Sequence, residues 1–122
     1  MSPEKEQILY KKYPTIFRQK DLPMTETCMC WGIDTGDGWF TLIDDLCDQI
    51  MRTGIRVEAV QVKEKFGGLR FYFEPYDDQI GKLVSDAEAK SYTICDMCGG
   101  AGAPRKGGWV VTRCNKCYAR KD

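Results

Sequence analysis

Four cysteines near the carboxyl end of the sequence have the residue type and the spacing of a metal-binding site. They form two pairs, Cys95-x2-Cys98 and Cys114-x2-Cys117, with fifteen residues between the pairs. Two residues between thiols let the chain turn so that both sulfurs face one ion at about 2.3 Å. This arrangement is typical of a four-thiolate zinc site. The sequence therefore predicts that these cysteines bind one structural Zn²⁺.

The segment between the cysteine pairs has the pattern of a short β-hairpin. A first strand is expected near 101–106, a turn at Gly107-Gly108, and a second strand over WVVTR at 109–113. Two metal-binding knuckles joined by a hairpin form a zinc ribbon. Four protein ligands leave no open position on the ion for water or substrate. The apparent zinc affinity of small fingers, about 10–16 kcal/mol, is enough to fold such a segment.

Two other interpretations of the cysteine pairs stay open. Four thiolates also suit iron, as in rubredoxin-like sites, although zinc is the commoner ion in a small ribbon. CDMCGGAG (95–102) resembles the C-x-x-C-x-G-x-G unit of DnaJ-type chaperones, which implies several such units. CNKCYARK (114–121) has no glycines after its cysteines, so we prefer the ribbon.

Three further cysteines, Cys28, Cys30 and Cys47, lie outside this pattern. We interpret them as small buried side chains, as free cysteines often are. A second metal site completed by an outside ligand is the alternative. A disulfide between Cys28 and Cys30 is disfavoured, because one intervening residue gives poor disulfide geometry.

The sequence lacks the residues from which most active sites are built. It has no histidine, the usual general base near neutral pH. It has no GxxxxGK[ST] loop and no GxSxG motif. Its acids at 34–45 could bind a hard cation, but DTGDGW (34–39) lacks the alternating acids and distal Glu of a calcium loop. We therefore expect turn and capping roles for these acids, and no enzymatic activity.

The segment before the cysteines has mixed periodicities. A first helix is expected to start at Ser2-Pro3 and to end before Pro14. Its predicted inward-facing residues are Ile8, Leu9 and Tyr13. Residues 15–37 are irregular by pattern, apart from a short strand expected at 28–33.

A second helix is predicted by apolar residues at three- and four-residue spacing, namely Trp39, Ile43, Leu46, Cys47 and Ile50. Asp37 is its expected cap, and Gly54 marks its end.

A β-hairpin is expected next, with strands at 57–64 and 69–74 that turn on Gly67-Gly68. Its core-facing residues are predicted to be Val60, Val62, Leu69, Phe71 and Phe73. A third helix, roughly 77–91, carries Ile80, Leu83, Val84 and Ala87 at helical spacing.

These elements predict an α+β fold, with a helical and β-hairpin domain over 1–92 and a zinc-ribbon module over 93–122. The length of 122 residues suits one modest core with an appendage. No apolar run approaches the ~20 residues that cross a bilayer, so no membrane contact is expected. The amino-terminal residues lack a signal-peptide pattern. We expect a cytoplasmic protein, where thiols stay reduced.

Charge is balanced overall but unevenly distributed. The chain has 18 basic and 18 acidic residues, yet residues 21–51 contain seven acids and no base. The acids predicted to form a partner-binding face are Asp34, Asp37, Asp44, Asp45 and Asp48. Residues 95–122 contain six bases and two acids. The ribbon residues that could contact nucleic acid are Arg105, Lys106, Trp109, Arg113, Lys116 and Arg120.

Three segments, taken in order, resemble a widespread and largely uncharacterised group of small proteins encoded by phages and prophages. They are GDGWFTLIDDLCDQI (36–50), QVKEKFGGLRFYFE (61–74) and ICDMCG…GWVVTRCNKC (94–117), and the resemblance covers about residues 14–118. Many members have a histidine as the last ligand, where this chain has Cys117. The resemblance implies a phage setting and a zinc module, without a defined function.

Two binding roles are consistent with these features. The first is binding of a host protein, as an inhibitor, adaptor or counter-defence protein, through the acidic face. The alternative is nucleic-acid binding by the basic ribbon. A zinc–tetrathiolate site carries two negative charges, which reduces the ribbon's excess of four positive charges to about two. We therefore rank the host protein first. Pairing of two copies along an open edge of the hairpin is a further option.

Overall fold

A computed structural model describes residues 1–120 of the chain, and the side chains of residues 1–119. The predicted α+β fold with a carboxyl-terminal four-cysteine module is confirmed. The helices and strands are α1 (Pro3–Lys12), β1 (Ile33–Asp34), α2 (Phe40–Thr53), β2 (Glu58–Lys65), β3 (Gly68–Glu74), α3 (Asp78–Ser91), β4 (Ala103–Arg105), β5 (Val111–Arg113) and α4 (Asn115–Arg120). Three single 3₁₀ turns are η1 (Arg18–Asp21), η2 (Met29–Trp31) and η3 (Asp37–Trp39).

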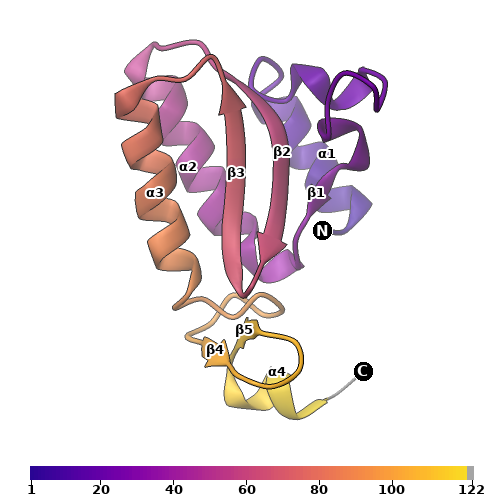
Figure 1. Cartoon of the computed structure of the whole chain (residues 1–122), viewed down its shortest axis with the longest axis vertical. Coiled ribbons are helices and arrows are strands. Elements are labelled where there is room, and N and C mark those ends of the chain that lie inside the picture. Colours follow the sequence, from indigo (N-terminus) through magenta and orange to yellow (C-terminus); the bar gives the residue numbers. More distant parts are fainter. Residues whose placement is uncertain (121–122) are drawn as a thin grey trace.

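The first sheet has the strand order β1-β2-β3, and β4 and β5 form a separate two-stranded sheet. In Figure 1 the first sheet stands upright, with the helices beside and behind it, and the cysteine module lies below the turn between β2 and β3. The helices bury one face of the sheet. The other face carries Gln61, Lys63, Arg70 and Tyr72, which are half-buried or exposed.

The first helix begins at Pro3 as predicted, but it buries a different stripe. Leu9 and Tyr10 are buried, whereas Ile8 is 48% exposed, so the prediction of Ile8 as a core residue is wrong. Tyr13 is buried just beyond the helix, where its hydroxyl donates to Asp44. The prediction took Ile8 for a core residue because apolarity alone does not fix the rotation of a helix against its neighbours.

The segment before α2 contains less strand than the sequence suggested. The chain makes the 3₁₀ turn η2 where residues 28–33 were expected to be extended, and only Ile33 and Asp34 form a strand. This strand pairs in parallel with β2, with Ile33 opposite Val62. Gly32, at φ +80°, separates the turn from the strand.

The second helix matches the predicted stripe, and Ile43, Leu46, Cys47 and Ile50 are all buried in it. Gly54 ends the helix in the left-handed conformation. Asp37 does not cap it. Asp37 lies in η3, and its carboxylate accepts the backbone N–H of Ser2 at 2.7 Å.

The hairpin turns one residue earlier than predicted. Phe66 and Gly67 both have positive φ, 53° and 84°, as in a type I′ turn, and Gly68 already belongs to β3. The register of β2 shifts between Ala59 and Gln61. Because of that shift Ala59 and Val62 are buried while Val60 is half-buried, so Val60 and Val62 do not share one core face.

The third helix packs against β3, and the side chain of Asp77 caps its amino-terminal end. The carboxylate of Asp77 accepts the backbone N–H of Ile80 at 2.9 Å. At the other end the hydroxyl of Ser91 accepts the backbone N–H of Leu69 at 2.9 Å, which joins α3 to β3.

The cysteine module is docked against the rest of the chain at two places. The backbone N–H of Gly38 donates to the carbonyl of Asp96 at 2.9 Å, and the indole N–H of Trp39 donates to the carbonyl of Ile94 at 2.9 Å. At the hairpin turn, the hydroxyl of Thr112 donates to the carbonyl of Gly67 at 2.6 Å. The segments GDGW (36–39) and KFGG (65–68) are therefore the two contact points for the module. The division at residues 92 and 93 stays a prediction.

A side chain at Gly38 is expected to disrupt this docking. A Cβ there would lie 2.1 Å from the carbonyl oxygen of Cys95 and 2.6 Å from the carbonyl carbon of Asp96, both backbone atoms. We expect Gly38→Ala to lower the free energy of unfolding by about 1–3 kcal/mol, measured by urea denaturation. Gly108→Ala is the matched control, since nothing lies within 4 Å of a Cβ there. Equal stability of the two variants would contradict the docking described here.

Candidate metal centre

The first cysteine pair lies in a loop that folds back on itself between α3 and β4. The backbone N–H of Cys95 donates to the carbonyl of Gly100 at 2.8 Å, and the N–H of Gly99 donates to the carbonyl of Cys95 at 3.0 Å. Gly99 has φ +82°, which closes the loop in a conformation that favours glycine. The glycines after Cys98 thus let the chain return toward the sulfurs.

The second pair is positioned by the start of α4. Cys114 precedes this helix and Cys117 lies within it. The backbone N–H of Cys117 points at the sulfur of Cys114 at 3.3 Å, and the N–H of Gly100 points at the sulfur of Cys98 at 3.4 Å. Each knuckle therefore supplies a backbone donor to one of its own sulfurs, which favours the thiolate form.

The four sulfurs are brought together as a tetrahedral ligand set requires. Their atoms all lie within 4.8 Å of one another. Cys98 Sγ and Cys114 Sγ are 3.8 Å apart, which equals the edge of about 3.8 Å that a tetrahedron with metal–sulfur bonds of about 2.3 Å has. Four sulfurs and no oxygen form a soft donor set. The arrangement could therefore hold one metal ion.

The pKa values of the thiols follow from this clustering. Burial disfavours the Cys95 thiolate, but hydrogen bonds from backbone N–H groups, those of Cys98 and Cys114 first, outweigh burial and lower its pKa to about 6. The backbone N–H of Cys117 lowers the pKa of Cys114. Cys117 has a pKa raised to about 12, first because its thiol hydrogen-bonds to Cys114. The cluster therefore favours the thiolate form of Cys95 and Cys114 and the protonated form of Cys117. A bound divalent cation would offset the repulsion between thiolates, so that all four sulfurs could be deprotonated.

The predicted nucleic-acid residues of the module divide into two groups. Arg105 and Arg113 are used inside it: Arg113 Nε donates to the carboxylate of Asp96 at 2.9 Å, and Arg105 Nε donates to the carbonyl of Arg113 at 3.0 Å. Lys106, Trp109 and Lys116 are exposed. Arg120 ends α4, and its side chain lies outside the described residues.

The predicted acidic residues have different surroundings in the structure. Asp34 lies beside Lys63 in the parallel register of β1 and β2. Asp45 lines a cleft between α2 and α3, together with Asp86, Lys5 and Lys90.

The remaining acids have partners within the chain. Lys12 Nζ lies 2.8 Å from the carboxylate of Asp44, and Arg52 Nε lies 2.8 Å from that of Asp48. Burial raises the pKa of Asp44, but hydrogen bonds from Lys12 and Tyr13 outweigh it and hold that pKa below its usual range.

The other cysteines are not brought together with ligands. Cys47 is fully buried in the core, and burial raises its pKa strongly. Cys28 is exposed and Cys30 is half-buried, so the interpretation as buried side chains holds only for Cys47. The Cys30 thiol points at the carbonyl of Thr27 at 3.6 Å. Within residues 1–120, the four-cysteine cluster is the one group of three or more His, Cys, Asp or Glu side chains close enough to hold an ion.

Sequence reasoning missed a group of residues where the hairpin meets the module. Phe66 is 68% exposed and Trp109 is 79% exposed, and both line one groove with Lys63, Lys65 and Val110. The signal was present in KEKF (63–66), where two lysines alternate along a strand and precede an aromatic residue. That Trp109 lies beside this segment depends on the docking of the module, which no local pattern reveals.

Comparison of the chain with protein-family models, with curated proteins and with solved structures finds no match. Among the described helices, none has the length and apolar character required to span a bilayer. The site must therefore be interpreted from its own geometry.

Replacing a ligand cysteine is expected to weaken metal binding. We expect one metal ion per purified chain by elemental analysis, and well below one for Cys98→Ser after dialysis, because three thiolates bind more weakly than four. Cys28→Ser is the matched control, since Cys28 is also exposed but lies outside the cluster. Full metal content in Cys98→Ser would show that the ligand set is wrong.

Proposed function

We propose that this chain is a small nucleic-acid-binding protein without catalytic activity, held in shape by one structural zinc ion. The four-sulfur donor set supports zinc, which suits a closed tetrahedral site. Iron would fit the same donors, and the elemental analysis described above distinguishes the two metals. With all four positions occupied by protein, the ion has no open site at which to activate water or substrate.

One observation carries the choice of partner: two lysines that form no ion pair among the described residues line one groove with two exposed aromatic rings, where the hairpin meets the module. Lys63 and Lys65 form no ion pair within the described part of the chain. Phe66 and Trp109 lie among the most exposed large side chains. Lysines that contact phosphates and aromatic rings that stack on bases are the recurrent combination in nucleic-acid sites.

This choice reverses the ranking made from sequence. The host-protein hypothesis relies on an acidic face of five carboxylates, and three of them interact with groups of the same chain. A carboxylate that already has a cationic partner adds little to the attraction of a basic protein.

Binding of a host protein remains the second candidate, favoured by Asp34 and Asp45, which are exposed and form no ion pair among residues 1–119. A pull-down from bacterial lysate tests it. A host protein retained by the wild type and lost with Asp34→Lys plus Asp45→Lys would support it.

The phage setting, the cytoplasmic location and a homodimer through an edge strand of the first sheet, β1 or β3, also remain proposals.

Nucleic-acid binding is expected to weaken steeply with salt. We expect a fluorescent oligonucleotide to bind in 50 mM salt, and to bind less tightly in 200 mM salt, because lysines that contact phosphates release counterions. Replacing both Lys63 and Lys65 with Ala should reduce the slope of log K against log salt by about 1.4 for a single strand. Fluorescence anisotropy at several salt concentrations measures both quantities.

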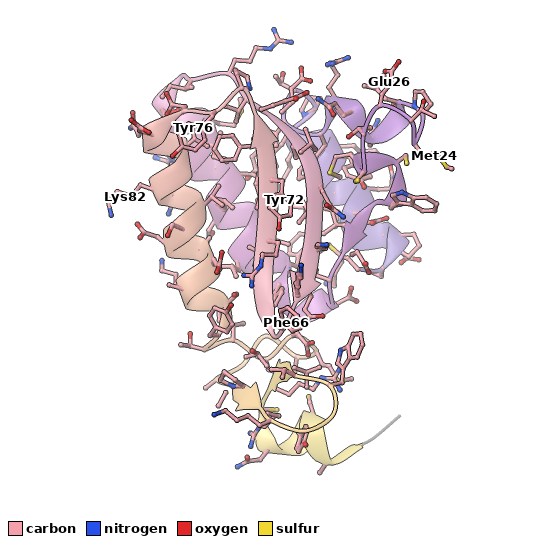
Figure 2. All side chains as sticks on the ribbon, viewed as in Figure 1. Met24, Glu26, Phe66, Tyr72, Tyr76 and Lys82 are labelled. Carbon is pink, nitrogen blue, oxygen red and sulfur yellow. The ribbon has the colours of Figure 1, made fainter. Side chains whose placement is uncertain are left out.

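Lys82→Ala is the control for this experiment. Lys82 is an exposed lysine on α3, distant from the hairpin turn (Figure 2). Its replacement should leave the salt slope unchanged. Absence of binding to any DNA or RNA, even in 50 mM salt, would overturn the proposed function.

A further inference from the structure

We infer that the groove between the β2–β3 turn and the loop before β5 binds the unpaired bases of single-stranded nucleic acid, stacked on Phe66 and Trp109. This inference rests on the proposed function and assigns its site. The groove is lined by Lys63, Glu64, Lys65, Phe66, Gly108, Trp109 and Val110. Its volume of about 340 Å³ lies at the lower end of the range for small-ligand sites, about 300–1,000 Å³.

Phe66 lines the groove with a backbone conformation that is unfavourable for a bulky residue. It occupies the first central position of a type I′ turn, with φ 53°, where Asn or Asp is the usual residue. A bulky side chain is disfavoured in this left-handed region. It is also 68% exposed, so burial does not offset the cost. Strain at an exposed aromatic residue indicates a role for the ring other than stability.

The charges around the rings fit a polyanion. Lys63 and Lys65 alternate along β2 and so share one side of the strand, which is the uncovered face of the sheet. Glu64, the acid between them, is used in the turn, where its carboxylate accepts the backbone N–H of Gly67 at 2.6 Å. The ammonium group of Lys65 lies 5.6 Å from the centre of the Phe66 ring. Phosphates could therefore contact the lysines while the adjoining bases stack on the rings.

The uncovered face of the sheet extends this site. Tyr72 lies on β3 opposite Gln61 and is 43% exposed. In Figure 2, Tyr72 lies over β3, and Phe66 lies at the end of the hairpin above the module. A strand that leaves the groove can follow this face, with Tyr72 as a further stacking surface. A duplex keeps its base faces inside the helix, so the rings select single strands.

Both sides of the groove depend on the docking of the module. Phe66 belongs to the hairpin and Trp109 to the segment between the cysteine pairs. They are brought together by the hydrogen bond from Thr112 to Gly67, and the lack of a side chain at Gly67 leaves room for Val110, whose Cγ1 would lie 3.3 Å from a Cβ there. The site therefore needs the folded module, although none of the four clustered cysteines lines the groove.

The double variant Phe66→Asn plus Trp109→Ala is expected to lower the affinity for nucleic acid without lowering the stability of the fold. Asn-Gly is the preferred type I′ pair, so Phe66→Asn removes the ring and relieves the strained turn. The probes are dodecamers of deoxythymidine and of uridine, and a twelve-base-pair duplex. We expect the wild type to prefer single strands, and the double variant to lose at least about thirtyfold in affinity, since each stacked base contributes about 1–3 kcal/mol. Its thermal stability should be unchanged or higher.

Trp31→Ala is the matched control, because Trp31 is 69% exposed and lies away from the groove, beside Gly32 and Cys30. It should bind as the wild type does. Phe66→Tyr with Trp109→Phe keeps two rings and should retain most of the affinity. The deoxythymidine and uridine arms show whether DNA or RNA is the better ligand.

Several results would overturn the inference. If the double variant binds as the wild type does while Lys63→Ala plus Lys65→Ala binds poorly, the protein binds nucleic acid but the rings do not stack on bases. Tighter binding of the duplex than of either single strand also contradicts a site for unpaired bases. If the wild type binds none of the three probes, the proposed function itself fails.

Discussion

The backbone of Asp96 is the link on which the arrangement of the molecule depends. Its carbonyl accepts the N–H of Gly38, its own N–H donates to the carbonyl of Thr112, and its carboxylate accepts from Arg113. Asp96 also follows Cys95 directly, so the position of the first metal-binding knuckle is fixed against both η3 and β5. A metal ion that closes the knuckle therefore stabilises an interface as well as a small module.

The interface between the cysteine module and the rest of the chain accounts for two glycines and for the position of two exposed rings. Gly38 leaves no room for a side chain against the knuckle, and the carbonyl of Gly67 accepts a hydrogen bond from the hydroxyl of Thr112. The same contact places Trp109 beside the hairpin turn, where Phe66 is exposed in a strained conformation. Hydrogen bonds made by the backbone of Gly38 and Gly67 thus hold the two parts together, while Lys65, Phe66 and Trp109 at the junction are exposed.

Local patterns predicted what depends on local spacing. The cysteine pairs, the buried stripe of α2, the third helix and both hairpins were recognisable because helix and strand periods and knuckle spacing are short-range properties. The errors concern tertiary choices. Ile8 is exposed, and Asp37 accepts from the backbone of Ser2 instead of capping α2. Arg105 and Arg113 have partners inside the module, and their predicted contact with nucleic acid stays a prediction. The groove was missed because its two rings are separated in sequence and meet only after docking.

Amide hydrogen exchange, with and without a chelator, tests most directly whether a bound metal holds this interface together. The account predicts that metal removal speeds exchange sharply at two amides. The N–H of Gly38 donates across the interface to Asp96, and the N–H of Asp96 donates within the module to Thr112. Val62 and Phe71, buried in the first sheet, should keep most of their protection. Unchanged protection of Gly38 and Asp96 in metal-free, folded protein would contradict the account, because the interface would then need no ion.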